Sequence, residues 1–182
     1  MNFCSECGQS VELKIPSGDN RERHVCAHCE TIHYKNPNIV AGCLPIWEDK
    51  VLLCKRAIEP RHGFWTLPAG FMENDESLEQ AANRESVEEA NANLDVTSLY
   101  TVVSLPHINQ VYILYLAKLK DLNFSAGIES LDVQLFTEEQ IPWDNLAFRT
   151  IDFTLKRYFE DRKNNTFPVH HSTIEKNNRY QK

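Results

Sequence analysis

The alternation of apolar and polar positions along the chain predicts mostly strands. The expected strands cover residues 39–47, 51–55, 99–105, 110–119 and 131–136. The polar triplet Glu48-Asp49-Lys50 separates the first two, and Pro106-His107-Ile108-Asn109 separates the next two. Apolar runs joined by such short polar turns are typical of β-hairpins. Residues 63–72 are rich in Gly, Pro and aromatic side chains, and we expect them to form a strand that leads into a structured loop.

Residues 77–90 form the clearest predicted helix. Ser77 is expected to cap its N-terminus, and Gln80, three residues further on, completes a capping box. Asn91 follows the last helical residue, at a position where the left-handed backbone conformation favours Gly and then Asn.

A second helix is expected further along the chain. Its apolar side chains recur at helical spacing, at Leu146, Ile151, Leu155, Tyr158 and Phe159. Asp144 or Asn145 is expected to cap its N-terminus. From Glu160 the chain is polar and is expected to fray, although Phe167-Pro168-Val169 has the apolar character to dock on the rest of the protein. The strands and helices together predict a mixed sheet flanked by two helices.

Residues 1–36 differ from the rest because they combine two Cys-x-x-Cys pairs with little apolar periodicity. A segment of this kind builds no core unaided and needs a metal or a covalent staple. Asn36-Pro37-Asn38 is typical of a turn and marks a domain boundary. We therefore expect a small stapled unit at 1–36, a main domain at 37–160 and a polar C-terminal tail at 161–182.

Composition and charge indicate which kinds of partner the chain is expected to bind. A chain of 182 residues with 42% apolar and 25% charged side chains is typical of a soluble globular protein. The net charge of −7 argues against non-specific nucleic-acid binding, which needs Lys and Arg, and fits a small substrate that arrives with metal ions. The longest apolar runs, 39–47 and 111–117, are far shorter than the roughly 20 residues that span a bilayer, so no membrane partner is expected.

The cysteines indicate both a compartment and a metal. Cys43 and Cys54 lie in apolar segments and are expected to be buried, inert thiols. Free thiols and no visible signal peptide predict a reducing cytoplasm. The other four have the spacing of a structural zinc site, and the proposed ligands are Cys4, Cys7, Cys26 and Cys29. Two disulfides or a redox pair are the alternatives. The nearby His24, His28 and His33 are expected at the surface or beside the ligands.

Three carboxylates dominate the first predicted helix. Glu85, Glu88 and Glu89 are three and four residues apart, which places them on one side of the helix, where like charges destabilise it. Hard divalent cations such as Mg²⁺ would neutralise them. Taken alone, the three glutamates fit a solvated helix face better than a metal site.

The wider spacing removes most of that ambiguity, because it resembles the Nudix box. Its six fixed positions are filled by Gly70, Glu76, Arg84, Glu85, Glu88 and Glu89. Segments 4–37, 63–71 and 141–148 are together similar to the zinc-ribbon branch of the Nudix hydrolases. Two positions depart from the pattern: Ser86 stands where an aliphatic residue is usual, and Asn91 replaces a Gly. Neither is a proposed metal ligand.

The resemblance implies an α+β fold, in which an α/β/α Nudix sandwich with a mixed sheet follows an N-terminal zinc ribbon. It also implies hydrolysis of phosphorus-containing anhydrides with Mg²⁺ or Mn²⁺. Glu85 and Glu89 would be the principal ligands, assisted by Glu88 and the Gly70 carbonyl. Arg84 would orient Glu88, and Glu76 would accept N–H groups at the helix start.

Other site residues are expected from their positions beside the box. The general base is expected to be a box glutamate or Glu129, which precedes a strand. Phe64, Phe71 and His107 are candidates for binding substrate, whereas Trp65 is expected to pack in the core.

The resemblance favours ADP-ribose or FAD as substrate, with AMP and a phosphorylated product. NADH or NAD, or an RNA cap bound with help from the ribbon, is the alternative. Relatives that prefer NADH carry a Ser-Gln-Pro-Trp-Pro-Phe-Pro array that does not occur after Asn91. The ribbon's basic residues, Arg21, Arg23, His24 and Lys35, make only a sparse stripe for RNA. A catalytically inactive ligand sensor also stays open, and a homodimer is expected by analogy with the family.

Overall fold

The computed structural model describes residues 1–176. The chain divides into two compact units, Met1–Pro37 and the part from Asn38 onward.

The N-terminal unit is a three-stranded antiparallel sheet with almost no apolar interior. Its strands are β1 (Val11–Lys14), β2 (Arg23–Cys26) and β3 (Ile32–His33), in the order β1-β2-β3. Its buried residues are Cys4, Val25 and Cys26. Such a small buried set cannot offset the conformational entropy of ordering the segment, so the unit depends on its cysteines.

The second unit is built on one mixed sheet. Its strands are β4 (Asn38–Trp47), β5 (Lys50–Arg56), β6 (Trp65–Thr66), β7 (Ala69–Phe71), β8 (Leu94–Leu105), β9 (Gln110–Leu119), β10 (Ser130–Phe136) and β11 (His170–Thr173). The main path runs β10-β5-β4-β9-β8-β11, with β6 paired to β5 and β7 to β4. The β4–β9 and β8–β11 pairs are parallel and the others antiparallel. The predicted hairpins between β4 and β5 and between β8 and β9 are confirmed.

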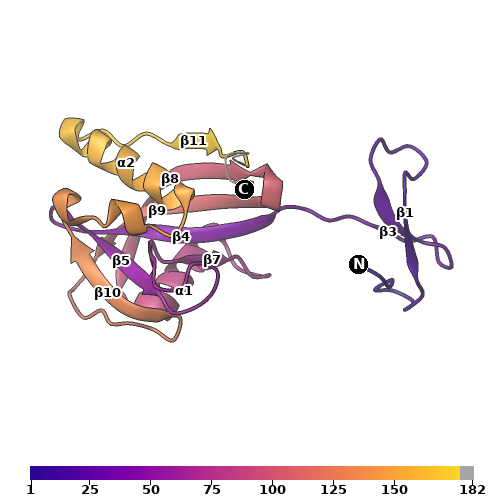
Figure 1. Ribbon diagram of the computed structural model, residues 1–182, viewed down its shortest axis with the longest axis horizontal. Coiled ribbons are helices and arrows are strands. Elements are labelled where there is room, and N and C mark those ends of the chain that lie inside the picture. Colours follow the sequence, from indigo (N-terminus) through magenta and orange to yellow (C-terminus); the bar gives the residue numbers. More distant parts are fainter. Residues whose placement is uncertain (177–182) are drawn as a thin grey trace. The chain divides into compact units, whose positions relative to one another are not determined.

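Two helices cover the opposite faces of this sheet, α1 (Leu78–Ala90) and α2 (Arg149–Asn164) (Figure 1). Alternate residues of each strand therefore point to different helices. On β5, Leu52 and Cys54 join the core under α1, whereas Val51 and Leu53 join the core under α2. This alternation with both faces buried makes the predicted three-layer α+β sandwich, and the mixed sheet with two helices is confirmed.

Helix α1 begins and ends as the sequence predicts. The Ser77 hydroxyl accepts a hydrogen bond from the backbone N–H of Gln80, and the Gln80 side chain accepts one from the Ser77 N–H. Asn91 takes the left-handed conformation, with φ of 47°.

Helix α2 begins differently from the prediction. Asp144 and Asn145 belong to a separate 3-10 turn, Trp143–Asn145, and the residue at the N-cap is Phe148, which makes no side-chain cap. Two further 3-10 turns, Pro106–Ile108 and Glu138–Gln140, lie between strands. The helical spacing of apolar residues predicts the body of α2 correctly. It does not locate the start of the helix, which depends on tertiary packing.

The segment after residue 160 also differs from the polar tail expected at 161–182. Helix α2 continues to Asn164, and β11 then pairs in parallel with β8. Phe167 stacks on Tyr158 with 5.9 Å between ring centroids, so the predicted docking of this apolar segment is confirmed. His170 Nε2 lies 2.7 Å from Asp161 Oδ2, which fixes β11 to the helix. Residues 177–182 of the expected tail lie outside the described part of the chain.

Within residues 1–176, neither helix combines the length and apolar composition needed to cross a membrane.

Candidate functional site

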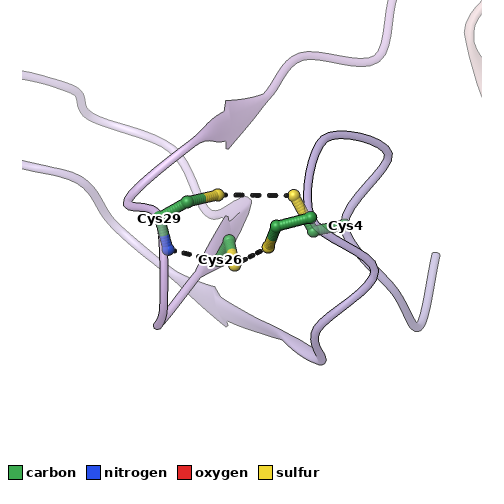
Figure 2. Close-up of side chains that lie close together, drawn as sticks. Cys4, Cys26 and Cys29 are labelled. Atoms are coloured by element: carbon green, nitrogen blue, oxygen red, sulfur yellow. Dashed lines mark hydrogen bonds between the residues drawn. The ribbon is translucent and has the colours of Figure 1, made fainter.

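Four cysteine sulfurs converge in the N-terminal unit (Figure 2). All four lie within 4.8 Å of one another, with 3.6 Å between Cys4 and Cys29 and 3.4 Å between Cys7 and Cys26. A disulfide would bring two sulfurs to about 2.05 Å. Four sulfurs at about 2.3 Å from a tetrahedral zinc lie roughly 3.8 Å apart, close to the separations here. The arrangement therefore fits a structural zinc ion better than it fits two disulfides.

The surroundings of the four sulfurs act on Cys7 and Cys29 in opposite directions: burial and hydrogen bonds with neighbouring cysteines raise the pKa of Cys7 to about 12. Hydrogen bonds from Thr31 lower the pKa of the Cys29 thiol to about 6. His33 Nε2 lies 3.3 Å from Cys4 Sγ, beside the cluster and not within it, as the sequence predicted. Four sulfur ligands complete a tetrahedron, so the metal would hold structure and leave no position for a substrate.

The second site lies on α1, where the three glutamates do not behave alike. Glu85 is 9% exposed and Glu89 is 5% exposed, whereas the Glu88 side chain is 57% exposed. Successive helical residues are rotated by about 100°, so Glu88 and Glu89 point in clearly different directions. The structure thus presents two buried carboxylates and one at the rim.

The loop before α1 closes against these two buried carboxylates. The backbone N–H of Ala69 donates to Glu89 Oε2 at 3.2 Å. A Cβ on Gly70 would overlap the Glu85 carboxylate, so only glycine permits this approach. The β7 pairing to β4 holds the loop in place. As a result, the Gly70 backbone lies directly beside Glu85.

Arg84 organises the remaining carboxylates. Its guanidinium contacts Glu76 at 2.8 Å, Glu85 at 2.8 Å and Glu88 at 3.1 Å. It also donates to the Phe71 carbonyl oxygen at 3.1 Å. Glu76 in turn accepts from the backbone N–H of Glu73 at 2.7 Å, as expected for a residue at the helix start. One arginine therefore links the loop, the start of α1 and the carboxylate face.

These environments move the pKa values of the glutamates in opposite directions. The hydrogen bond from Arg84 lowers the pKa of Glu76 to about 2. Burial raises the pKa of Glu89 to about 8, and the nearby negative charges of Glu85 and Glu129 add to this effect. Burial also raises the pKa of Glu85. A buried carboxylate with a raised pKa is electrostatically unsatisfied, and a cation beside it would relieve that condition.

The loop between β9 and β10 docks on the C-terminal end of α1. The N–H of Gly127 donates to the Glu89 carbonyl oxygen at 3.0 Å, and a Cβ on Gly127 would overlap the backbone of Glu88. The Asn91 side chain donates to the Ser125 carbonyl oxygen at 3.2 Å. This docking brings Glu129 to the same cleft as Glu85 and Glu89.

A cleft of about 1530 Å³ contains most of the predicted site. The predicted residues that line it are Gly70, Phe71, Arg84, Glu85, Glu88, Glu89, His107 and Glu129. Phe64 is not among the lining residues and lies instead beneath the Arg61 guanidinium. Trp65 packs edge-on against Phe136 in the core, as predicted.

Sequence reasoning missed several residues of this cleft, including Arg56, Tyr112, Phe148 and Thr150. Arg56 is a basic residue at the end of an apolar strand, which was the one available signal. Nothing in the sequence links it to Phe148 and Thr150, which come from the start of α2.

Family models match both units. The one described as Nudix N-terminal, a zinc ribbon, matches residues 2–35, and the one described as NUDIX domain matches residues 36–158. The second match alone covers more than half of the chain. The chain belongs to the Nudix family.

Individual relatives agree with this assignment. A crystal structure of a NUDIX hydrolase from Nitrosomonas europaea shares 57% identity and a TM-score of 0.94, covering 97% of this chain and 100% of that one. The NAD-capped RNA hydrolase NudC of Edwardsiella ictaluri is 37% identical over 106 residues, 57% of this chain and 38% of NudC. That of Vibrio vulnificus is 31% identical over 152 residues, 78% of this chain and 53% of NudC. The chain therefore spans only part of the length of these curated relatives.

Proposed function

We propose that this chain is a divalent-metal-dependent pyrophosphohydrolase, which cleaves the diphosphate bond of a nucleoside diphosphate linked to another moiety. The observation that carries the proposal is the pair of buried carboxylates, Glu85 and Glu89, in the wall of a large cleft. Membership of the Nudix family supports the same reaction class.

The residues present fit a divalent cation. A carboxylate has about four acceptor positions, and Glu89 uses one of them, for the Ala69 N–H, among the described residues. Glu85 accepts through Oε1 from Arg84. Glu85 and Glu89 would hold Mg²⁺ or Mn²⁺, assisted by Glu88 and the Gly70 carbonyl oxygen. Such cations neutralise phosphate charge and activate water for attack.

The chain's own residues supply the rest of the chemistry. Arg84 holds Glu85 and Glu88 in place, so that the carboxylate face is organised before substrate arrives. Glu129, in the same cleft, is the proposed general base that takes a proton from the attacking water. The water oxygen would bond to one phosphorus while the bridging P–O bond breaks, which gives AMP and a phosphorylated product from an adenine nucleotide.

For the substrate, the relatives favour NAD or NADH, free or at the 5′ end of RNA, because the curated relatives are named NAD-capped RNA hydrolases. This preference reverses the order expected from the sequence. ADP-ribose or FAD is the second candidate, favoured by the absence of the Ser-Gln-Pro-Trp-Pro-Phe-Pro array after Asn91. An RNA substrate would have to bind to a chain with a net charge of −7, which argues against non-specific binding of nucleic acids.

A comparison of kcat/KM values tests both the proposed substrate class and the proposed site. NADH, NAD-capped RNA, ADP-ribose, FAD and a nucleoside triphosphate would be assayed at saturating Mg²⁺, with the Glu89→Gln protein as the blank. We expect one of the dinucleotides or capped RNA to exceed the triphosphate by at least about tenfold, the ratio that 1.4 kcal/mol of transition-state binding supplies. A preference for the triphosphate would contradict the proposed substrate class. Activity equal in both proteins would contradict the proposed site.

We also propose a cytoplasmic location and a homodimeric assembly. Six free cysteines suit a reducing cytoplasm. A homodimer is proposed from family resemblance, and sedimentation equilibrium at micromolar concentration would test it.

A further inference from the structure

The wall of the cleft away from α1 includes the first turn of α2. Ala147, Phe148, Arg149 and Thr150 line the same cleft as Glu85 and Glu89. Phe148 at the N-cap offers no side-chain hydrogen bond. Among residues 1–176, the backbone N–H groups of Arg149 and Thr150 have no acceptor. The N-terminus of a helix carries partial positive charge, so the start of α2 favours anions at this wall of the cleft.

Thr150 provides a second and independent indication of a ligand. Its side chain is 1% exposed, and its hydroxyl has no hydrogen-bond partner among the described residues. An unpaired buried hydroxyl destabilises a fold, because it gives up its hydrogen bonds to water without replacing them. By contrast, the neighbouring Thr154 hydroxyl is also buried but is paired to both Thr101 and the Thr150 carbonyl oxygen. Two buried hydroxyls have no partner among the described residues, those of Ser130 and Thr150, and Thr150 is the one whose residue lines the cleft.

Arg56 adds a buried positive charge at the same place. It is 9% exposed, and its guanidinium lies 5.1 Å from the centroid of the Phe148 ring. Its Nε donates to the Pro60 carbonyl oxygen at 2.9 Å, which fixes the direction of the group. Among the described residues, neither Nη atom of Arg56 has a hydrogen-bond acceptor, and no carboxylate forms an ion pair with it. The positive charge of Arg56 acts on Glu89, but without a direct ion pair a buried guanidinium still favours a ligand that supplies negative charge.

We propose that Arg56, Thr150 and the free N–H groups at the start of α2 form a phosphoryl-binding subsite for the substrate's diphosphate. Phosphate oxygens are suited to this set of donors, since they accept from a planar guanidinium, a hydroxyl and a helix N-terminus together. The subsite faces the same cleft as the carboxylates, so one phosphoryl group would be held by α2 and Arg56 while cations beside Glu85 and Glu89 engage its neighbour. This inference rests on the proposed function and names the residues that position its substrate.

Thr150→Val is the sharpest test, with Thr154→Val as its matched control. Thr150→Val removes a hydroxyl that has no partner in the protein, so the Tm of the ligand-free protein should stay equal or rise. The KM for the best substrate should rise roughly tenfold, as expected for one hydrogen bond to a charged group, with kcat changed less. Thr154→Val should lower the Tm and leave KM unchanged. A fall in Tm with an unchanged KM for Thr150→Val would show that the hydroxyl is structural, and would overturn the proposal.

Arg56→Gln tests the charge, with Arg157→Gln as the control. Arg157 is an exposed arginine of α2 that lies over Phe153, outside the cleft. The probe is inorganic phosphate in the presence of chelator, titrated against the Tm of the full chain, so that the readout is independent of activity. Phosphate should raise the Tm of wild type and Arg157→Gln, but not of Arg56→Gln or Thr150→Val.

The two proposals fail in distinguishable ways. Phosphate stabilisation that depends on Arg56 and Thr150 in a protein inactive on every nucleotide would support the subsite and contradict the hydrolase. Hydrolysis with KM values indifferent to both variants, and no phosphate effect on Tm, would overturn the subsite and leave the hydrolase standing. If KM rises in both variants while AMP and phosphate compete equally well, the subsite is confirmed and binds free phosphate as well as substrate.

Discussion

The side-chain amide of Asn91 donates a hydrogen bond to the carbonyl oxygen of Ser125 at 3.2 Å and joins the C-terminal end of α1 to the loop that carries Glu129. A glycine at position 91 would adopt the same left-handed backbone without strain, but it could not make this bond. The departure from the family pattern at this position therefore adds a contact to the site.

Replacing Asn91 with Gly should separate these two roles. The backbone geometry survives, so the Tm should fall little, by the equivalent of about 0.5–1.5 kcal/mol for one exposed hydrogen bond. The loop at 121–129 should exchange its amide protons faster, and kcat should fall because Glu129 is positioned less firmly. Hydrogen exchange and steady-state kinetics measure both effects. Unchanged exchange in this loop would show that Gly127 and the backbone alone hold it.

Loss of one buried carboxylate should abolish catalysis without unfolding the protein. Glu89→Gln keeps the shape and can still accept from the Ala69 N–H, so the Tm should hold. The rate should fall by roughly 10²–10⁴, as for loss of a positioned charge or acid–base group. Added Mn²⁺ should restore part of it. Glu79→Gln on the same helix is the control, since its amide oxygen can still accept from the Tyr115 hydroxyl. Equal activity of the two variants would mean that the glutamate face is merely solvated.

Glu76 should contribute to stability in a pH-dependent way. Its pKa is lowered from 4.5 to about 2 in the folded protein, so its contribution is complete above about pH 4.5 and is lost as the pH falls toward 2. Glu76→Gln should therefore lower the urea midpoint at pH 7, and the gap from wild type should narrow between pH 4.5 and 3. The gap should be small because solvent screens this surface pair. A gap that is constant with pH would show that the charge of Glu76 is not what stabilises the fold.

Zinc should be present in the purified protein independently of the catalytic metal. After dialysis against a mild chelator, elemental analysis should return about one zinc per chain. Cys26→Ser should lose that zinc and unfold the N-terminal unit, while the second unit keeps its own melting transition. Zinc-free protein with Cys4 disulfide-bonded after reducing purification would contradict the assignment.

The parts of the fold that could be predicted are those fixed within a few residues. Ser77 and Gln80 form a capping box because both partners lie in one turn. The apolar runs of β4 and β9 predict strands that are buried on both faces. The start of α2 was misplaced because no local cap exists there. Phe148 stands at that position through its tertiary contacts, which include the Arg56 guanidinium.

The candidate site also combines residues that local spacing predicts with residues that depend on distant contacts. The Nudix spacing predicts that Glu85 and Glu89 share one side of α1, because regular helix geometry converts spacing into direction, and both residues line one cleft. The same spacing gave no sign that Glu88 would stay at the rim, since that depends on what covers α1. Arg56 and Thr150 meet at the cleft although 94 positions separate them in the sequence. Residues so far apart in the sequence come together only because the sheet is complete and α2 packs on one of its faces (Figure 1).

The pairing of β11 with β8 covers what would otherwise be an edge of the sheet. β8 has β9 on one side and β11 on the other. A chain cut after Asn164 would leave the backbone donors and acceptors along Thr101–Ser104 facing water, on a strand already rich in β-branched residues. Unpaired edges of this kind recruit the same edge of another molecule. We expect such a shortened protein to aggregate while α1 and its carboxylates stay in place, although the cleft would lose Ile174, Glu175 and Lys176 from its wall. The strand β11 thus protects the sheet from other copies of the protein.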